Sequence, residues 1–435
     1  MNDRRVVGTK TAMQQVIETP FGSQWKVPKE WELVSLKDIT SDWRGGAPFE
    51  PEDFTAHGFP VLHKGGIQRG GNILIDSKKK TFTTEEYAQN HQKSVIDKSY
   101  MAATLRDLVP SGPSIGLIAD LRRSPSEKYI LAQGAYGFLI DIDRVKPMYL
   151  VWLSNYEPFR EYIKRYCVGS TQIHIRTPIF QELKIPLPPI AEQKRIAAIL
   201  DKAEELRGLR RKALGELDAI SQSIFLEMFG DPVTNPKGWE THLLGNLTVE
   251  GLQNGLYKTS SDYGEGTPIL RIDAFYNGRV TKLDSLKRVR ISLAEQETYG
   301  LQKDDIVINR VNSIEYLGKS ALIPRLLEPV IFESNMIRFR LDRKYACPRF
   351  IVEFLQTPFI KSQIRTGTKD AVNQSSINQQ DVKAFQIRVP PLPLQQEFAR
   401  RVEAIEHLKT THRESLAQLG ALFASLQHRA FRGEL

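Results

Sequence analysis

Two long segments of the chain carry apolar residues at alternating spacings of three and four, the pattern of a helix that packs along one face. The first segment follows Pro188 and Pro189 and carries Ile199, Ala203, Leu206, Ala213, Leu217, Ile220 and Ile224. The second follows Pro390 and Pro391 and carries Ile405, Leu408, Leu419, Leu422 and Leu426. Proline is tolerated before a helix or in its first turn. The pattern therefore predicts two helices of about 40 residues, each about 60 Å long.

Short apolar runs broken by Gly, Asn and Pro occupy the segment before each predicted helix. Examples are "IGLIAD" and "YILAQGAYGFLIDI" in the first segment, and "DDIVINRV" and "PVIFESNMIRFRL" in the second. Runs of this length between turn residues are typical of β-strands. We therefore expect an α+β fold, with two mixed α/β domains that are each followed by a long helix.

The two halves of the chain resemble each other. At an offset of 208, "PKEWELVSLKDIT" (28–40) aligns with "PKGWETHLLGNLT" (236–248), and Gly70 aligns with Gly278. At an offset of 202, the 45 positions from Ile185 to Phe229 include 13 identities, where chance and helical patterning together supply about six. The sequence thus predicts an internal duplication.

Each predicted helix could close over the core of its own domain, or the two could pair with each other. For one isolated helix the first arrangement is favoured. A duplication favours the second, because two similar helices can pair around an internal two-fold axis as subunits do in an isologous dimer. We expect antiparallel pairing. The predicted boundaries are a leader of unassigned role at 1–27, domains at 28–185 and 231–387, and helices at 186–230 and 388–435.

Net charge favours a polyanionic partner. The chain has 60 Lys and Arg against 51 Asp and Glu, a formal charge of +9. Its two cysteines lack metal or redox spacing, which suits a reducing compartment. No signal peptide and no apolar run of about 18 residues occurs, so we expect a cytoplasmic protein without a membrane span.

Catalytic motifs are missing from the sequence. The stretch "LGKS" (317–320) has Ser313 where a phosphate loop needs glycine, and no Asn-Pro-Pro-aromatic tetrapeptide of an adenine methyltransferase occurs. Tripeptides of the Asp/Glu-x-Lys type occur about as often as composition predicts. No His-Glu-x-x-His motif is present, and Cys167 is better explained as a core side chain than as a metal ligand. We expect no catalytic residue, no metal and no cofactor in this chain.

Gly-rich and basic segments suit recognition of nucleic acid. Arg, Asn and Gln can form paired hydrogen bonds with base edges, and Lys and Arg also neutralise phosphate. For any one segment, a solvated loop is the simpler explanation. The DNA-binding candidates from this chemistry are Lys64, Gln68 and Arg69 in the first half, and Arg271, Asn277, Arg279, Asn309, Arg310 and Asn312 in the second.

Several motifs in order resemble the specificity subunit of type I restriction-modification enzymes. "WELVSLKDIT" and "WETHLLGNLT" resemble the family's entry into each target-recognition domain. "RDLVPSGPSIGLIAD" and "KDDIVINRVNSIEYLGKSALI" resemble its central motif, and "GSTQIHIRTPIFQELKIPLPPIAEQKRI" and "TKDAVNQSSINQQDVKAFQIRVPPLPLQQEF" resemble its exit into the helix. The resemblance covers nearly all of the chain from Trp31. In the exit motif the second copy has "NQSSIN" where the first has "TQIHIR".

The resemblance implies a non-catalytic reader of double-stranded DNA, with one recognition domain for each half of a bipartite, asymmetric site. It implies two modification subunits that use S-adenosylmethionine to methylate adenine N6, and motor-nuclease subunits that use ATP and Mg. By motif it adds Gln172 and His174 in the first exit loop, and Asn373 and Gln374 in the second, to the DNA-binding candidates.

Two other classes of protein stay open. A divergent nuclease would cleave DNA as a purified chain without partners. A helical scaffold that binds protein alone would show DNA binding that is absent or insensitive to salt.

Overall fold

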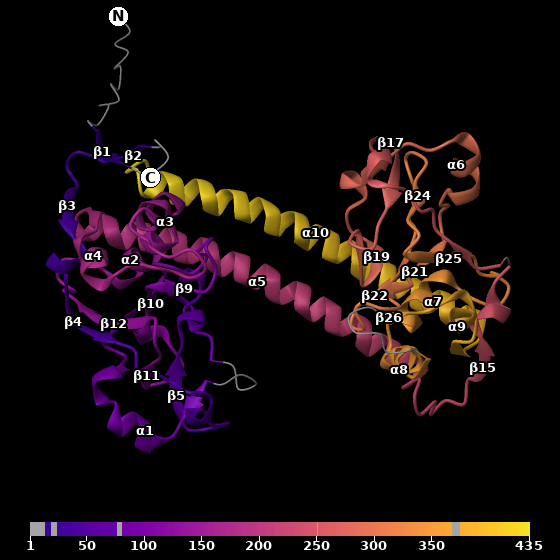
Figure 1. The fold of residues 1–435 in the computed structure, drawn as a ribbon, viewed down its shortest axis with the longest axis horizontal. Helices are drawn as coiled ribbons and strands as arrows, with labels where there is room; N and C mark the ends of the chain where they lie inside the picture. The colour runs from indigo at the N-terminus through magenta and orange to yellow at the C-terminus, as the bar shows by residue number, and fades with distance from the viewer. Residues whose placement is uncertain (1–13, 19–23, 76–80, 250, 368–374) are drawn as a thin grey trace, which may run out of the picture. The chain divides into compact units, whose positions relative to one another are not determined.

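The computed structural model describes residues 14–18, 24–75, 81–249, 251–367 and 375–435. Two compact units divide the chain: the first holds Met1–Lys212 with Glu414–Leu435, and the second holds Ala213–Arg413. Each unit combines one mixed α/β domain with part of two long helices, α5 (Ile190–Phe229) and α10 (Leu392–Ala430) (Figure 1). The α+β fold with two tandem domains and two long helices is as predicted.

The first unit contains several small sheets. Its main antiparallel sheet has the strand order β10-β8-β12-β4, and a second sheet has the order β6-β5-β11-β7; the pairs β1-β2, β13-β9 and β14-β3 complete it. The strands are β1 (Gln14–Glu18), β2 (Gln24–Pro28), β3 (Glu32–Ser35), β4 (Thr40–Gly45), β5 (Phe59–Leu62), β6 (Phe82–Thr83), β7 (Val95–Asp97), β8 (Met101–Thr104), β9 (Arg106–Asp107), β10 (Ile118–Asp120), β11 (Lys128–Leu131), β12 (Ala135–Ile140), β13 (Ile173–His174) and β14 (Lys184–Leu187). The short helices are α1 (Glu85–Asn90), α2 (Pro147–Asn155), α3 (Glu157–Lys164) and α4 (Thr177–Glu182).

The second unit repeats this plan with a larger central sheet. The sheet orders are β16-β25-β21-β23-β19-β18 and β20-β17-β24, with the pairs β22-β26 and β15-β27. The strands are β15 (Glu240–Leu243), β16 (Gln253–Asn254), β17 (Tyr263–Leu270), β18 (Phe275–Tyr276), β19 (Gly278–Val280), β20 (Lys287–Val289), β21 (Ile306–Asn309), β22 (Val311–Asn312), β23 (Ser320–Leu322), β24 (Ile331–Phe332), β25 (Met336–Phe339), β26 (Ser375–Ser376) and β27 (Gln386–Val389). The short helices are α6 (Leu293–Tyr299), α7 (Pro348–Leu355), α8 (Pro358–Gly367) and α9 (Gln379–Lys383).

Strand pairing shows that the two units are copies of one fold. The parallel pair β5-β11 matches Ile130 with Val61, and the parallel pair β17-β24 matches Ile331 with Ile269. In the first unit β10 pairs antiparallel with β8, and in the second unit β23 pairs antiparallel with β21. The duplication that the aligned sequences predicted is therefore also present in the backbone.

Each unit contains one end of α5 beside the opposite end of α10, running antiparallel. In the first unit, the Arg207 guanidinium lies 4.7 Å from the ring centre of Phe423, and Arg195 donates to the carbonyl of Leu435. In the second, Phe225 packs against Phe398, with ring centres 5.6 Å apart. The helices begin at Ile190 and Leu392, just after the proline pairs, because proline lacks the N–H that a helix interior needs.

A buried glutamine fixes the start of each long helix to its domain. The side chain of Gln193 accepts from the N–H of Lys146 (2.8 Å) and donates to the carbonyls of Arg144 (2.9 Å) and Pro188 (2.8 Å). Lys146 is the residue that caps α2. Since the Gln193 side chain is completely buried, its three hydrogen bonds set the angle at which α5 leaves the first domain.

Gln395 repeats this joint in the second unit. Its side chain accepts from the N–H of Cys347 (2.8 Å), the cap of α7, and donates to the carbonyls of Tyr345 (3.1 Å) and Pro390 (2.7 Å). It too is completely buried. Gln193 and Gln395, which are identical in the aligned helices, thus make the same contacts in both units, and their role is structural.

The far end of each long helix is held by a tryptophan. Trp239 donates from Nε1 to the carbonyl of Phe229 at the end of α5 (2.8 Å), and Trp25 donates to the carbonyl of Phe431 just after α10 (3.0 Å). The residues from Phe229 to Trp239 are one continuous stretch of chain. In the first unit Trp25 and Phe431 are 406 residues apart in the sequence, so a contact between distant segments holds that helix end.

Candidate nucleic-acid interface

A tight loop between β9 and β10 stands out in the first unit because two buried charged groups organise it. The carboxylate of Asp107 accepts from the N–H and the hydroxyl of Ser114 (2.7 and 2.6 Å). Burial alone would raise the pKa of Asp107, but these hydrogen bonds keep it below its usual value. The loop leaves Leu108 and Val109 exposed at its tip. A loop held this firmly presents a defined surface to a ligand.

Arg160 of α3 is the second charged group, and it lies under the same loop. Its guanidinium donates to the carbonyls of Ile115 (3.1 Å), Gly112 (3.2 Å) and Pro113 (2.7 Å), and more weakly to that of Ser154 (3.4 Å). Burial lowers the pKa of Arg160 to about 10. A buried guanidinium that binds several backbone carbonyls replaces the water that the loop would otherwise need.

A basic cluster lies beside this loop. His174 pairs with Arg106 across β13 and β9, and a Cβ placed on Gly134 would touch the side chains of both Arg106 and Lys64. Burial and the neighbouring Arg106 charge lower the pKa of Lys64. The structure therefore brings together two sequence-predicted residues, Lys64 and His174, and adds Arg106, which the sequence analysis did not single out.

The other candidates of the first unit lie near the surface. Gln68 and Gln172 are exposed, and the Gln68 amide donates to the carbonyl of Gly65 (2.6 Å). Arg69 is exposed and forms an ion pair with Glu157 (3.6 Å). An exposed pair of this kind contributes little to stability and can open for a phosphate. These positions stay predictions.

The second unit carries an equivalent loop between β22 and β23. Gly116 and Gly318 close the two loops with φ of 75° and 74°. A Cβ on Gly116 would overlap the side chain of Ile163, and a Cβ on Gly318 would overlap that of its counterpart Ile364. Backbone bonds match as well, with Ile175 N–H to Leu105 O in one copy and Ile377 N–H to Arg310 O in the other. Glycine is needed at 318 for this turn, which explains the "LGKS" stretch without any phosphate loop.

Equivalent positions in the two loops carry different side chains. By this backbone match, Leu105, Arg106 and Asp107 of the first copy correspond to Arg310, Val311 and Asn312 of the second copy, in that order. Arg310 is partly exposed and donates to the carbonyl of Ser334 (3.3 Å), while the Asn312 side chain accepts from the N–H of Ser313 (2.8 Å). The two copies thus offer different hydrogen-bonding groups from the same place in the fold.

Lys319 is a further residue that the sequence analysis missed. Its ammonium donates to the carbonyl of Ile272 and lies 4.0 Å from the ring centre of Tyr276 and 4.7 Å from that of Phe275. Burial lowers its pKa. The counterpart in the first copy is Leu117, so no signal in the repeat marked this position.

Three further candidates of the second unit have structural contacts within the domain. Asn309 is completely buried and donates to the carbonyl of Tyr316 (3.1 Å), so it closes the loop from inside and does not reach a ligand on the surface. Arg271 lies 3.6 Å from Glu333 and over the ring of Tyr263. Asn277 has φ of 48° and forms the β18-β19 hairpin turn with Gly278, for which Asn-Gly is favoured.

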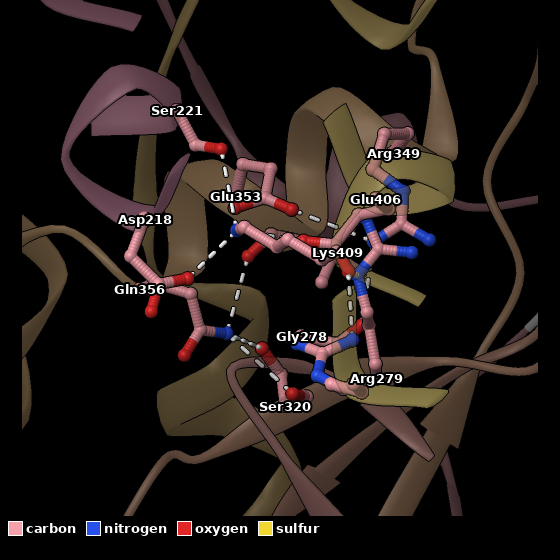
Figure 2. A network of polar contacts seen from close by, with 12 residues as sticks. Asp218, Ser221, Gly278, Arg279, Ser320, Arg349, Glu353, Gln356, Glu406 and Lys409 are labelled. Carbon is pink, nitrogen blue, oxygen red and sulfur yellow. Dashed lines mark hydrogen bonds and ion pairs between the residues drawn. The ribbon is translucent and has the colours of Figure 1, made fainter. Parts of the chain in front are cut away.

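Arg279 belongs to a polar network between the domain and the long helices of the second unit, shown in Figure 2. Its Nε lies 3.0 Å from Glu406 of α10, and burial lowers its pKa to about 10. Lys409, which is 4% exposed, contacts Glu406 (2.9 Å) and Asp218 of α5 (2.7 Å). Arg279 therefore holds the helix against the domain, and its contact with DNA stays a prediction. Asn373 and Gln374 lie outside the described residues.

The predicted helix-pairing residues are divided between the two units. In the first, an apolar groove is lined by Ile199, Ala203, Leu206, Leu419, Leu422 and Leu426. In the second, Ile405 is buried and Ile224 packs against the core, but Ile220 and Leu408 are 45% and 50% exposed and Leu217 is partly exposed. Lys409 takes the buried place next to Leu408, because its ammonium is satisfied by Glu406 and Asp218.

In the part of the chain that the structure describes, no three His, Cys, Asp or Glu side chains gather where they could hold a metal ion. None of the described helices is long and apolar enough to cross a membrane.

Two similar mixed α/β domains, each with a polar loop at the same place and each adjoining the long helices, define a protein built from two tandem copies of one fold. A model of the type I restriction modification DNA specificity domain matches residues 28–217 and 236–420, so this chain belongs to that family. Both copies of the repeat are matched separately, which agrees with the internal duplication.

Relatives and solved structures agree with this assignment. The chain is 25% identical to the type I restriction enzyme EcoKI specificity subunit of Escherichia coli K12, over 95% of this chain and 91% of that protein. It is 24% identical to the StySPI specificity subunit of Salmonella potsdam, over 94% and 90%. The crystal structure of a type I restriction-modification S subunit from M. genitalium matches with a TM-score of 0.56 and 15% identity, over 92% of this chain and 96% of that chain. A structure concerned with complex assembly and conformational transition of the type I system matches with a TM-score of 0.52 and 18% identity, over 94% and 100%.

Proposed function

We propose that this chain reads a bipartite, asymmetric DNA sequence, one half with each recognition domain, as the specificity subunit of a type I restriction-modification complex. Specificity subunits are non-catalytic, in keeping with the family to which the chain belongs. The observation that supports two different half-sites is the pair of equivalent loops with unlike side chains, Arg106 and His174 in one and Arg310 and Asn312 in the other.

The partners in this proposal are DNA, two modification subunits and motor-nuclease subunits. The modification subunits would use S-adenosylmethionine to methylate adenine N6, and the motor-nuclease subunits would use ATP and Mg. Because α5 joins the two domains as one continuous helix, the half-sites would be separated by a spacer of fixed length that is not read. We propose that the protein acts in the cytoplasm, because its ligands in this proposal are chromosomal and foreign DNA.

Sequencing of methylated adenines in a host that expresses this chain with its modification subunit tests the proposal. We expect a two-part motif whose halves differ, and we expect exchange of residues 31–185 to change only one half. A single-part or palindromic motif would contradict the assignment of one half-site to each domain. Assembled complex whose DNA binding does not weaken as salt rises would favour a protein scaffold instead.

Replacing Arg106 or Arg310 with alanine should each affect one half-site. If the guanidinium reads a base, Arg106→Ala should weaken binding to the site by about 1–3 kcal/mol and relax one position in the first half, and Arg310→Ala should do so in the second. The measurement is equilibrium binding of the assembled complex to duplexes in which one half-site at a time is randomised. Equal loss on cognate and scrambled duplexes would assign the affected arginine to phosphate contact.

A further inference from the structure

A turn between β24 and β25 of the second unit carries a buried acid. The N–H of Arg310 donates to the carbonyl of Asn335 in this turn (2.8 Å), and the Arg310 guanidinium donates to that of Ser334 (3.3 Å). Glu333, which opens the turn, is 7% exposed, and its carboxylate accepts from the N–H of Ile272 (2.7 Å). Burial raises the pKa of Glu333. The turn thus brings a buried carboxylate to the edge of the candidate nucleic-acid interface.

Arg271 is the cation that meets this acid. Its Nε lies 3.6 Å from Glu333, and its guanidinium lies 5.8 Å from the ring centre of Tyr263. The two side chains of the ion pair differ in exposure, with 9% for Glu333 and 35% for Arg271. The carboxylate and the ring therefore restrict the orientation of the guanidinium, while a third of the arginine side chain stays open to a ligand.

The first unit forms the same turn without the acid. The N–H of Ala132 donates to the carbonyl of Leu62 (3.0 Å), and the N–H of Glu333 donates to that of Leu270 (3.0 Å). Ala132 is therefore the counterpart of Glu333. Since alanine supports the same strand pair and turn, the fold does not require this carboxylate, and burying one costs free energy unless it is paired. The arginine that it meets explains the buried charge.

Basic side chains border this turn in both units. In the first, a Cβ on Gly134 would lie 3.2 Å from the side chains of both Lys64 and Arg106. In the second, the two basic residues are Arg271 and Arg310. The same place in the fold is therefore positively charged in each unit, which suits an approach to DNA.

We infer that Arg271 reads a guanine in the half-site of the second domain, and that Glu333 is its positioning residue. A guanidinium can donate to O6 and N7 of guanine with two parallel hydrogen bonds. These acceptors belong to a neutral base, whereas a phosphate brought to Arg271 would be repelled by the Glu333 carboxylate. The inference rests on the proposed function, because it takes this side of the second domain to face DNA.

Replacement of single guanines by 7-deazaguanine tests the contact, because this base lacks the N7 acceptor and still pairs with cytosine. The assembled complex is bound to a duplex of the methylated sequence. We expect one substitution in the second half-site to weaken binding at least about fivefold for the unmodified chain, and less than about twofold for Arg271→Ala. A second half-site without guanine, no loss in the unmodified chain, or an equal loss in both proteins would overturn the inference.

Glu333→Gln tests the positioning role. Glutamine keeps a side-chain oxygen for the N–H of Ile272 but removes the charge that meets Arg271. We expect the loss caused by 7-deazaguanine to shrink to about twofold or less, and we expect the double variant with Arg271→Ala to bind as Arg271→Ala does. A general loss of structure would instead weaken binding to every duplex alike. A 7-deazaguanine loss that Glu333→Gln leaves unchanged would overturn the positioning role.

Arg343→Ala is the matched control. Arg343 pairs with Asp304 beyond the opposite end of the β21-β25 pair, where Ile306 meets Phe339. This variant should keep the 7-deazaguanine loss within about twofold of that of the unmodified chain, and disappearance of the loss would overturn the assignment to Arg271. Assembled complex without any sequence preference would overturn the proposed function. Sequence-specific binding that is insensitive to 7-deazaguanine in the second half-site would overturn the present inference alone.

Discussion

Gln395→Ala should lower the free energy of unfolding of the second unit by about 2–4 kcal/mol. The substitution leaves the N–H of Cys347 and the carbonyls of Tyr345 and Pro390 without their hydrogen-bond partner at a fully buried position. Each unsatisfied backbone group costs about 1–3 kcal/mol, and water that enters the space left by the side chain reduces this cost. Gln193→Ala should have the same effect on the first unit. Urea unfolding of the full chain, followed by fluorescence, measures both.

Gln396→Ala is the matched control, because Gln396 is the exposed neighbour on the same helix turn. It should change stability by less than about 0.5 kcal/mol. A Gln395→Glu variant adds a test of sign. Burial against two carbonyls would raise the pKa of the introduced carboxyl above its unfolded value, so the folded state would bind more protons and stability should fall as pH rises from about 4. A loss that is independent of pH, or equal losses in Gln395→Ala and Gln396→Ala, would contradict the role of the joint.

Arg160→Met should destabilise the first unit by about 3–5 kcal/mol, which makes it the largest effect expected of a single polar residue in this chain. Methionine fills a similar volume but cannot donate to the carbonyls of Ile115, Gly112 and Pro113, and unsatisfied buried carbonyls each cost about 1–3 kcal/mol. The loop between β9 and β10 should lose its conformation before the domain unfolds. The measurements are urea unfolding and hydrogen exchange of the loop amides.

Arg165→Met is the control for Arg160→Met, since Arg165 is exposed directly after α3. Its effect should stay within about 0.5 kcal/mol. In the assembled complex, Arg160→Met should also reduce discrimination in the half-site of the first domain and leave the other half unchanged. Normal protection of the loop amides in Arg160→Met would show that Asp107 and Ser114 hold the loop without the guanidinium.

The periodic patterns of the sequence were sufficient for the fold. The apolar stripes with their preceding prolines predicted α5 and α10, and the two offsets predicted the duplication, because both signals extend over many residues. The apolar stripe failed locally at Lys409, which is buried next to the exposed Leu408. A lysine can be buried when two carboxylates meet it. Glu406 lies one turn earlier on the same helix, but Asp218 comes from α5, far away in the sequence.

Candidate DNA residues were harder to choose, since residue type alone does not show where a side chain points. Arg279 and Asn309 have the chemistry to read bases, but the structure uses them to hold a helix and to close a loop. Arg106 begins the motif "RDLVPSGPSIGLIAD" but was not chosen as a DNA-binding candidate, because only the fold brings it beside Lys64 and His174. Such a signal needs contacts between residues far apart in sequence.

The two pairs of helix ends differ in chemistry, and this difference affects how the chain can fold. One pair meets through leucine and isoleucine beside Arg207 and Phe423. The other meets through Phe225 and Phe398 and, further along, through Lys409, Asp218 and Glu406. If a nascent helix end paired with the wrong copy, Lys409 would lose Asp218, the carboxylate that α5 supplies, and would keep only Glu406 of its own helix, which would destabilise the mispaired state. The duplicated helices therefore carry a check against mispairing during folding, which two identical copies of the repeat would lack.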